Sequence, residues 1–353
     1  MPPTTPAPAK GTLKAAKPIP VSQQLCGIEY SPKGDMLVAG TFEGGIRRWK
    51  VTPAELTDLP PLAGHNAWVQ CVAFDSKGER FFSADSWGRV NAWSADPVQT
   101  KPLWSVADAH STWIHAMAIH PKAEFLATAG RDNIIRLTDP ATGKEIRRWE
   151  AGDDVLAMTF HPSGLSLITG DLHGLIKEWD HSTGKLKREL NAKQMFLHDR
   201  LQDVGGVRCF AWNADASMLF AGGCQPKSGG FVQGFNLVIG FDWVSGQAKM
   251  NHKTTNEADG YVLDMHWNPD GFLMAVTSGQ PGQGKLIFLK PGEAQPFQSY
   301  PVPNAHSLAI HPDGKRLFVS ATNANSSGNG RQLGKDKEYP ANTSPLHGFE
   351  FVG

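Results

Sequence analysis

Apolar residues along the chain come in short runs, and most runs end at a turn rich in Pro, Gly, Asn or Asp. Within the runs, apolar and polar positions often alternate, which is the pattern of a half-buried β-strand. An apolar run followed by a turn recurs seven times, with 41 to 55 residues between successive turns. The seven turns begin at Ser31, Asp75, His120, His161, Asn213, Asn268 and His311. The pattern therefore predicts one supersecondary unit repeated along the chain.

Each unit continues with two further apolar runs, and a weaker fourth run often precedes the next unit. In the fourth unit, the runs AMTF, LSLITG and LIKEWD follow one another with turns between them. Short runs joined by tight turns predict antiparallel strands. Four strands in about 40 to 45 residues is the period of a propeller blade. The predicted fold class is all-β, a seven-bladed β-propeller of four-stranded antiparallel blades over residues 10–353.

The two ends of the sequence predict how this ring closes. The last run, HGFEF, is the third of its unit, so the last blade lacks a fourth strand. An open blade edge would expose unpaired backbone groups. We therefore expect an N-terminal strand from residues 10–19 to complete the last blade, and residues 1–9, MPPTTPAPA, to form a disordered tail.

The residues at the strand boundaries resemble the WD-repeat (WD40) family over residues 21–352. GHNAWVQCVAF and AHSTWIHAMAI stand where that family has its Gly-His opening and first strand, and LIKEWD stands where it has its Trp-Asp ending. The resemblance implies a network of a His, an Asp and a Trp in each blade. Blade two keeps His65 and Trp93 but has Trp87 at the expected Asp position. Blade three keeps His110 and Asp132 but has Thr138 at the expected Trp position, so the repeats are degenerate.

Charge and composition exclude several classes of binding partner. Thirty-four basic residues balance 34 acidic ones without a Lys/Arg-rich run, so no nucleic acid partner is expected. No signal peptide and no run of about 18 apolar residues is found, which predicts no membrane contact and a cytoplasmic location. The four cysteines form no C-x-x-C pair, so neither a disulfide framework nor a zinc site is expected; they are Cys26, Cys71, Cys209 and Cys224.

Because successive strands of a blade run in opposite directions, the connections between them lie alternately on the two faces of the disc. The loops that enter each blade and the turns between second and third strands share one face, which we call the insertion face; the remaining turns share the turn face. The long segments 191–206, 224–235, 251–260 and 322–346 all belong to the insertion face. Long loops on a rigid scaffold often carry function; the alternative is that they are neutral decorations.

The residue that begins each first strand is expected to ring the mouth of the central channel on the insertion face. These residues are Gln24, Trp68, Trp113, Asp154, Gly206, Tyr261 and Asn304. Trp and Arg are typical anchors of binding surfaces. The predicted partner-binding residues are Trp68, Trp87, Trp113, Arg131, Asp154 and Tyr261. The alternative is that each tryptophan only caps the junction between two blades.

An enzymatic alternative would place a divalent cation in the channel, as in lactonase-like propeller hydrolases. His115 and His306 share one repeat position, and Asp154, Asp203 and Asp259 lie near strand starts. The other residues of that repeat position have no consistent ligand character; they are Cys26, Gln70, Leu156, Arg208 and Leu263. We therefore predict no catalytic residues, no metal and no cofactor.

Two further groups are interpreted as structural. His120, His161 and His311 each precede a proline at the same turn position, which predicts turn residues rather than convergent metal ligands. Cys71 and Cys209 share a repeat position with small residues, where Asp264 is expected to be a hydrogen-bonded structural carboxylate.

The predicted function is a non-catalytic protein-binding platform or scaffold subunit. A protein or peptide partner would dock on the insertion face, with the tryptophans as anchors and the long segments of blades five to seven adding contacts. Zero net charge favours short-range packing over electrostatic steering.

Overall fold

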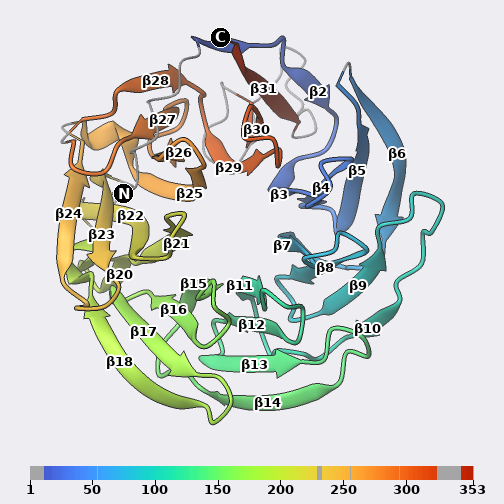
Figure 1. Cartoon of the computed structure of the whole chain (residues 1–353), viewed down its shortest axis with the longest axis horizontal. Helices are drawn as coiled ribbons and strands as arrows, with labels where there is room; N and C mark the ends of the chain where they lie inside the picture. The colour runs from blue at the N-terminus through green and yellow to red at the C-terminus, as the bar shows by residue number, and fades with distance from the viewer. Residues whose placement is uncertain are drawn as a thin grey trace, which may run out of the picture.

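The computed structural model describes residues 12–53, 55–228, 233–254, 256–293, 295–323 and 343–352. Its strands form a closed ring of seven antiparallel sheets around a central channel (Figure 1). The first strand of each blade lies on the channel and the fourth lies on the outer rim (Figure 1). The predicted seven-bladed propeller is confirmed. The predicted tail, residues 1–9, lies outside the described residues.

The first four blades follow the chain in order, each with four strands. Blade one contains β3 (Leu25–Tyr30), β4 (Met36–Thr41), β5 (Gly45–Val51) and β6 (Leu56–Ala63). Blade two contains β7 (Val69–Phe74), β8 (Arg80–Asp85), β9 (Val90–Ser94) and β10 (Trp104–Val106). Blade three contains β11 (Ile114–Ile119), β12 (Leu126–Gly130), β13 (Ile134–Thr138) and β14 (Glu145–Glu150). Blade four contains β15 (Val155–Phe160), β16 (Leu167–Asp171), β17 (Leu175–Asp180) and β18 (Lys185–Asn191).

The last three blades carry the additional elements. Blade five contains β21 (Val207–Trp212), β22 (Met218–Ser228), β23 (Gln233–Asp242) and β24 (Ala248–Lys253), preceded by η1 (Lys193–Met195), β19 (Phe196–Asp199) and β20 (Gln202–Gly205). Blade six contains β25 (Tyr261–Asn268), β26 (Phe272–Ser278), β27 (Lys285–Leu289) and β28 (Gln298–Pro301), preceded by η2 (Glu257–Asp259). Blade seven contains β29 (Ala305–Ile310), β30 (Arg316–Ala321) and β31 (Ser344–Val352), completed by β1 (Thr12–Ala15) and β2 (Ile19–Val21).

The N-terminal segment closes the ring, as predicted. β1 pairs antiparallel with β31 from Thr12↔Val352 to Ala15↔Phe349, and β2 continues the pairing from Ile19↔Leu346 to Val21↔Ser344. The expected single strand over residues 10–19 is thus two short strands, with Pro18 in the break between them. Leu13 is buried in the apolar core of blades six and seven, so packing reinforces the closure.

The blades pack against one another through apolar side chains. One repeat position on the second strand is at most 1% exposed in every blade; its residues are Leu37, Phe81, Leu126, Leu167, Leu219, Leu273 and Leu317. The exposed faces of outer strands such as β14 carry charged residues instead. The ring is therefore held by burial between neighbouring blades.

A β-bulge interrupts the first strand of every blade. In β7, Val69 pairs with Asp85 and Cys71 with Ala84, so Gln70 is an extra residue without a ladder partner. Equivalent register shifts occur in the other six first strands. A bulge bends its strand and redirects the side chain of the extra residue, which here lies on the channel side.

Residues of the turn between first and second strands connect neighbouring blades. The His120 Nε2–H donates to the Gly164 carbonyl at 3.0 Å, and the His311 Nε2–H donates to the Gly34 carbonyl at 3.1 Å. Asn268 makes the same contact to the Gly314 carbonyl at 3.1 Å. His161 instead packs against the rings of Trp212 and Trp243. The prediction that these histidines are turn residues is confirmed.

The long segments of the insertion face are more ordered than their composition indicated. Residues 191–206 contain η1 and the β19–β20 hairpin, and 251–260 contain the end of β24 and η2. Within 224–235 the expected loop is wrong for the residues that the structure describes: β22 runs to Ser228 and β23 begins at Gln233, and the two strands pair as far as Ser228↔Gln233. Most of 322–346 lies outside the described residues.

Blade two has a complete polar network, although its sequence indicated a missing Asp. Trp93 Nε1–H donates to Ser83 Oγ at 2.8 Å, Ser83 donates to His65 Nε2 at 2.7 Å, and His65 Nδ1–H donates to Asp85 Oδ2 at 2.8 Å. The carboxylate comes from the position two residues before Trp87. Trp87 does stand at the repeat position of Asp132, but Asp85 makes the contact with the histidine in its place, and Trp87 is 68% exposed.

Candidate functional site

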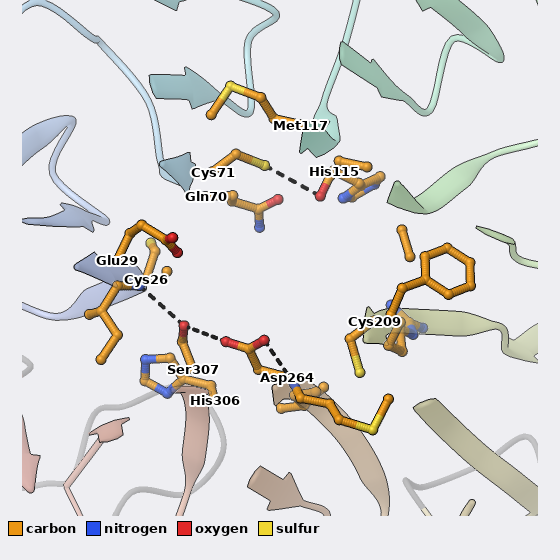
Figure 2. A pocket seen from close by; sticks show the side chains of 18 of the residues that line it. Cys26, Glu29, Gln70, Cys71, His115, Met117, Cys209, Asp264, His306 and Ser307 are labelled. Atoms are coloured by element: carbon orange, nitrogen blue, oxygen red, sulfur yellow. Dashed lines mark hydrogen bonds between the residues drawn. The ribbon is translucent and has the colours of Figure 1, made fainter. Parts of the chain in front are cut away.

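The central channel is lined by the bulge residues of the first strands. It has a volume of about 1010 Å³ and passes through the ring. Its lining includes all seven bulge residues that share the position of His115; they are Cys26, Gln70, His115, Leu156, Arg208, Leu263 and His306. Figure 2 shows Glu29, Gln70, His115, Asp264 and His306 around this space. The bulges therefore decide which side chains face the channel.

Asp264 is a structural carboxylate, as predicted. Its Oδ2 accepts hydrogen bonds from Ser307 Oγ and from the Leu308 N–H, each at 2.9 Å. Ser307 Oγ also accepts from the Ile28 N–H at 3.1 Å. These contacts, drawn in Figure 2, join blades six, seven and one at the channel wall.

Glu29 is a channel residue that the sequence analysis missed. Burial, reinforced by the negative charge of Asp264, raises the pKa of Glu29 to about 8. Its carboxyl group is therefore mostly protonated at neutral pH. The signal available in the sequence was its repeat position, where small residues such as Ala73, Ala118 and Ala211 stand in other blades.

The channel histidines at the bulge positions, His115 and His306, are held in the neutral form. Burial, together with the charges of Arg208 and Arg131, lowers the pKa of His115 to about 4. Burial also lowers the pKa of His306, whose Nε2–H donates to the Leu25 carbonyl at 3.0 Å. His306 is thus committed to the junction between blades seven and one.

Aromatic side chains form a continuous row on the insertion face, across blades one to three. The Phe42 and Trp68 rings lie 4.6 Å apart between centroids, Trp68 and Trp113 lie 5.3 Å apart, and Trp113 and His115 lie 5.6 Å apart. Phe42, in the turn between β4 and β5, was not among the predicted residues. The row leads from the face to the channel, because His115 belongs to both.

A polar group continues this row. His115 Nε2 lies 3.9 Å from Asp154 Oδ1. Burial raises the pKa of Asp154, and the charges of Arg131 and Arg208 oppose that rise. The Arg208 guanidinium in turn lies 4.9 Å from the centre of the Tyr261 ring. We call the whole set the arc: Phe42, Trp68, Trp113, His115, Arg131, Asp154, Arg208 and Tyr261.

The arc brings together five of the six predicted partner-binding residues. Arg131 is fixed beside Trp113, whose carbonyl accepts from the Arg131 N–H at 3.0 Å. Trp87, the sixth, lies on the turn next to Trp68, because the Ser86 N–H donates to the Trp68 carbonyl at 3.0 Å. Of the expected ring around the channel mouth, Gln24 and Asn304 line the channel itself.

Of the residues considered for a metal site, His115 and Asp154 lie close together, and Asp203 and Asp259 are bound elsewhere. Asp203 accepts from His198 Nδ1–H at 2.6 Å on the β19–β20 hairpin, and Asp259 pairs with Lys285 Nζ at 2.9 Å in blade six. Across the described parts of the chain, no group of three or more His, Cys, Asp and Glu side chains is placed to hold a metal ion. The four cysteines are free thiols.

Two family models match the first half of the chain. The model of the WD domain, G-beta repeat, matches residues 57–94, and that of the anaphase-promoting complex subunit 4 WD40 domain matches residues 94–163. Together with the seven-bladed ring, these partial matches support a β-propeller of the WD40 family. In the described residues, no helix is long and apolar enough to cross a membrane.

Curated relatives share parts of this propeller. The small ribosomal subunit protein RACK1y of Oryza sativa subsp. japonica is 26% identical over 45% of the chain and 46% of its own length. The cross-pathway control WD-repeat protein 2 of Flammulina velutipes is 26% identical over 45% of the chain and 49% of its length. The WD repeat-containing protein 90 of Xenopus tropicalis is 28% identical over 35% of the chain but only 6% of its length. The matched region thus spans less than half of each relative.

Proposed function

We propose that the chain is a non-catalytic protein-binding scaffold that docks a protein or peptide partner on its insertion face, through the arc and Trp87. The matches to WD40 family models and the similarity to WD-repeat relatives support an interaction role in general terms. The observation that carries the choice of surface is the row of rings from Phe42 to His115, with exposed indoles beside it. Trp68 is 40% exposed and Trp87 is 68% exposed.

Trp87 is available to a partner because it buries little surface within its own chain, and Trp68 presents the part of its ring that Phe42 and Trp113 leave exposed. Large aromatic anchors dominate the binding energy at protein interfaces. The charged members of the arc lie beyond the His115 end of the aromatic row, where they border the apolar anchors on one side. A partner that combines an apolar patch with a few polar groups fits this arrangement.

Trp87→Ala is the cleanest test, because little of that side chain is buried and its truncation should change the free energy of unfolding by no more than about 0.5 kcal/mol. The tagged wild-type protein and the variant would be compared for partner capture by quantitative mass spectrometry. Affinity would then be measured with the purified partner by calorimetry. We expect capture to fall at least about tenfold in Trp87→Ala.

Leu165→Ala is the control, because Leu165 lies on the turn face and is 75% exposed, so its truncation also disturbs little packing. It should leave the affinity unchanged. If Trp87→Ala, Trp68→Ala and Trp113→Ala all retain wild-type affinity while only stability changes, the tryptophans are junction caps and the proposed surface is wrong.

The lack of catalysis and a cytoplasmic location are parts of the same proposal. Elemental analysis of the purified protein tests the first part: a stoichiometric divalent ion would support the hydrolase alternative instead. Imaging of the tagged protein in cells tests the second.

A further inference from the structure

The β19–β20 hairpin ends in a turn whose backbone is unfavourable for its residues. The two strands pair as far as Asp199↔Gln202, so Arg200 and Leu201 alone form the turn. Both have positive φ, 53° and 61°. Two-residue hairpin turns of this type favour Asn-Gly, because other side chains are strained in the left-handed region. Arginine and leucine therefore destabilise the turn that they form.

The side chains at the tip bury little surface and make no hydrogen bond to the described residues that would offset the strain of the turn. Leu201 is 94% exposed. The side chain of Arg200 is 72% exposed, and its Nε lies 4.0 Å from Asp199 Oδ2, which is too long for a hydrogen bond. An apolar side chain and a cation are thus presented side by side to solvent on the insertion face.

The base of the hairpin is held firmly on the propeller. Met195, just before β19, is fully buried in the core of blades four and five, and its carbonyl accepts from the Gly206 N–H at 2.7 Å. Phe196 packs against the His173 ring with 4.6 Å between centroids. His173 also contacts Asp203 of the hairpin at 3.5 Å. The tip is therefore presented at a fixed position, which reduces the entropy lost when a partner binds.

We propose that Arg200 and Leu201 form a docking knob for a protein partner. Leu201 enters an apolar pocket of that partner, and Arg200 pairs with a carboxylate at the rim of the pocket. The exposed leucine defines the pocket, and the exposed guanidinium beside it defines the charge of the rim. The knob goes beyond the arc, because it is a separate contact on the insertion face and does not require the tryptophans to bind.

Photocrosslinking identifies what the knob touches. Leu201→photoleucine would be incorporated into the full chain in cells, and crosslinked peptides would be mapped by mass spectrometry. We expect a site on a different protein that is apolar and has an Asp or Glu beside it. We also expect the crosslink to be lost in an Arg200→Glu background and kept with Arg200→Lys. Crosslinks only within this chain or to a second copy of it would overturn the proposal.

A turn replacement separates binding from folding. The double variant Arg200→Asn, Leu201→Gly places the favoured sequence in the turn, so we expect a higher melting temperature together with an affinity for the crosslinked partner at least about tenfold weaker. Leu165→Asn is the matched control, because Leu165 is 75% exposed on the turn face; it should not change the affinity. A stabilised double variant with unchanged affinity would refute the knob.

The arc and the knob can fail separately. If Trp87→Ala binds normally and the turn replacement does not, the knob stands and the arc is wrong. If Trp87→Ala loses binding and the turn replacement binds normally, the arc stands and the knob is wrong.

Discussion

The Trp68 and Trp113 rings meet edge to face across the junction of blades two and three, with 5.3 Å between centroids and 63° between ring planes. The same pair can therefore seal a junction and present an aromatic surface. Stability and binding must be measured together to separate these roles.

A double-mutant cycle of Trp68→Ala and Trp113→Ala measures the structural part. Edge-to-face aromatic pairs contribute about 0.5–1.5 kcal/mol beyond their burial, and we expect a coupling energy in that range from urea unfolding. Trp68→Ala alone should cost less than Trp113→Ala, because Trp68 is 40% exposed and Trp113 is more buried. Strictly additive effects would show that the contact does not stabilise the junction.

Asp85→Ala should be strongly destabilising. The carboxylate ends a buried chain of hydrogen bonds, and its loss leaves the His65 Nδ1–H without its acceptor, at a cost of about 3 kcal/mol. Asp270→Ala, an exposed turn aspartate, is the control and should cost no more than about 0.5 kcal/mol. Equal effects of the two substitutions in chemical unfolding would mean that blade two does not depend on this network.

The same carboxylate predicts a loss of stability in acid. Burial acts to raise the pKa of Asp85, but hydrogen bonds from His65 and the backbone of Arg89 outweigh it and hold the pKa below its ordinary value. Its stabilisation is therefore present above the unfolded-state pKa of about 3.9 and is lost as the pH falls through the lower folded-state pKa. Asp85→Asn should flatten this part of the profile of unfolding free energy against pH.

Glu29 predicts the opposite dependence on pH. Its pKa in the folded protein, about 8, lies above the unfolded value of about 4.3. Between these values the unfolded chain releases the proton and the folded protein keeps it, so stability falls as the pH rises. Glu29→Gln should therefore gain stability relative to wild type from about pH 5 to 8 and level off above 8. An unchanged difference between the two proteins across this range would show that Glu29 titrates normally.

His173 predicts a pH-dependent attachment of the β19–β20 hairpin. A hydrogen bond to Asp153 raises its pKa, with further contributions from the charges of Asp153, Asp203 and Asp171; His198 pairs with Asp203 on the hairpin. The attachment is complete below the unfolded pKa of about 6.5 and weakens as the pH rises through the higher folded-state pKa. Its energetic effect should be small, because the side chain is 43% exposed.

Hydrogen exchange measures this attachment directly. Protection factors of β19 and β20 amides, corrected for intrinsic exchange, should decrease as the pH rises above about 6.5 in wild type and be independent of pH in His173→Gln. Protection in β22 serves as the internal reference. A wild-type hairpin with constant protection would contradict the role of His173.

The sequence allowed the architecture to be predicted because its signal repeats. A single alternating run followed by a turn is weak evidence for any fold. Seven such units in order, together with a segment that can close the ring, specify a propeller. Local composition was less reliable. The glycines and polar residues of segment 224–235 indicated a loop, yet its described parts, 224–228 and 233–235, lie in paired strands, because backbone hydrogen bonds do not require apolar alternation.

The site was predictable only where side chains follow the repeat. Trp68 and Trp113 start equivalent strands, so their proximity could be inferred. Asp85 was missed because a carboxylate two residues earlier reaches the same histidine, which fixed spacing does not reveal. Glu29 was missed because its environment depends on Asp264 of blade six, which belongs to a distant part of the sequence and faces the same channel.

The bulge in each first strand has a consequence for redesign. The extra residue has no ladder partner, as Gln70 shows, so its side chain can be exchanged without changing strand pairing. The seven positions surround an axial pore of about 1010 Å³. Where the side chain makes no junction contact, the chemistry of the pore can be changed separately from strand pairing, whereas His306 must be kept because it bonds to blade one.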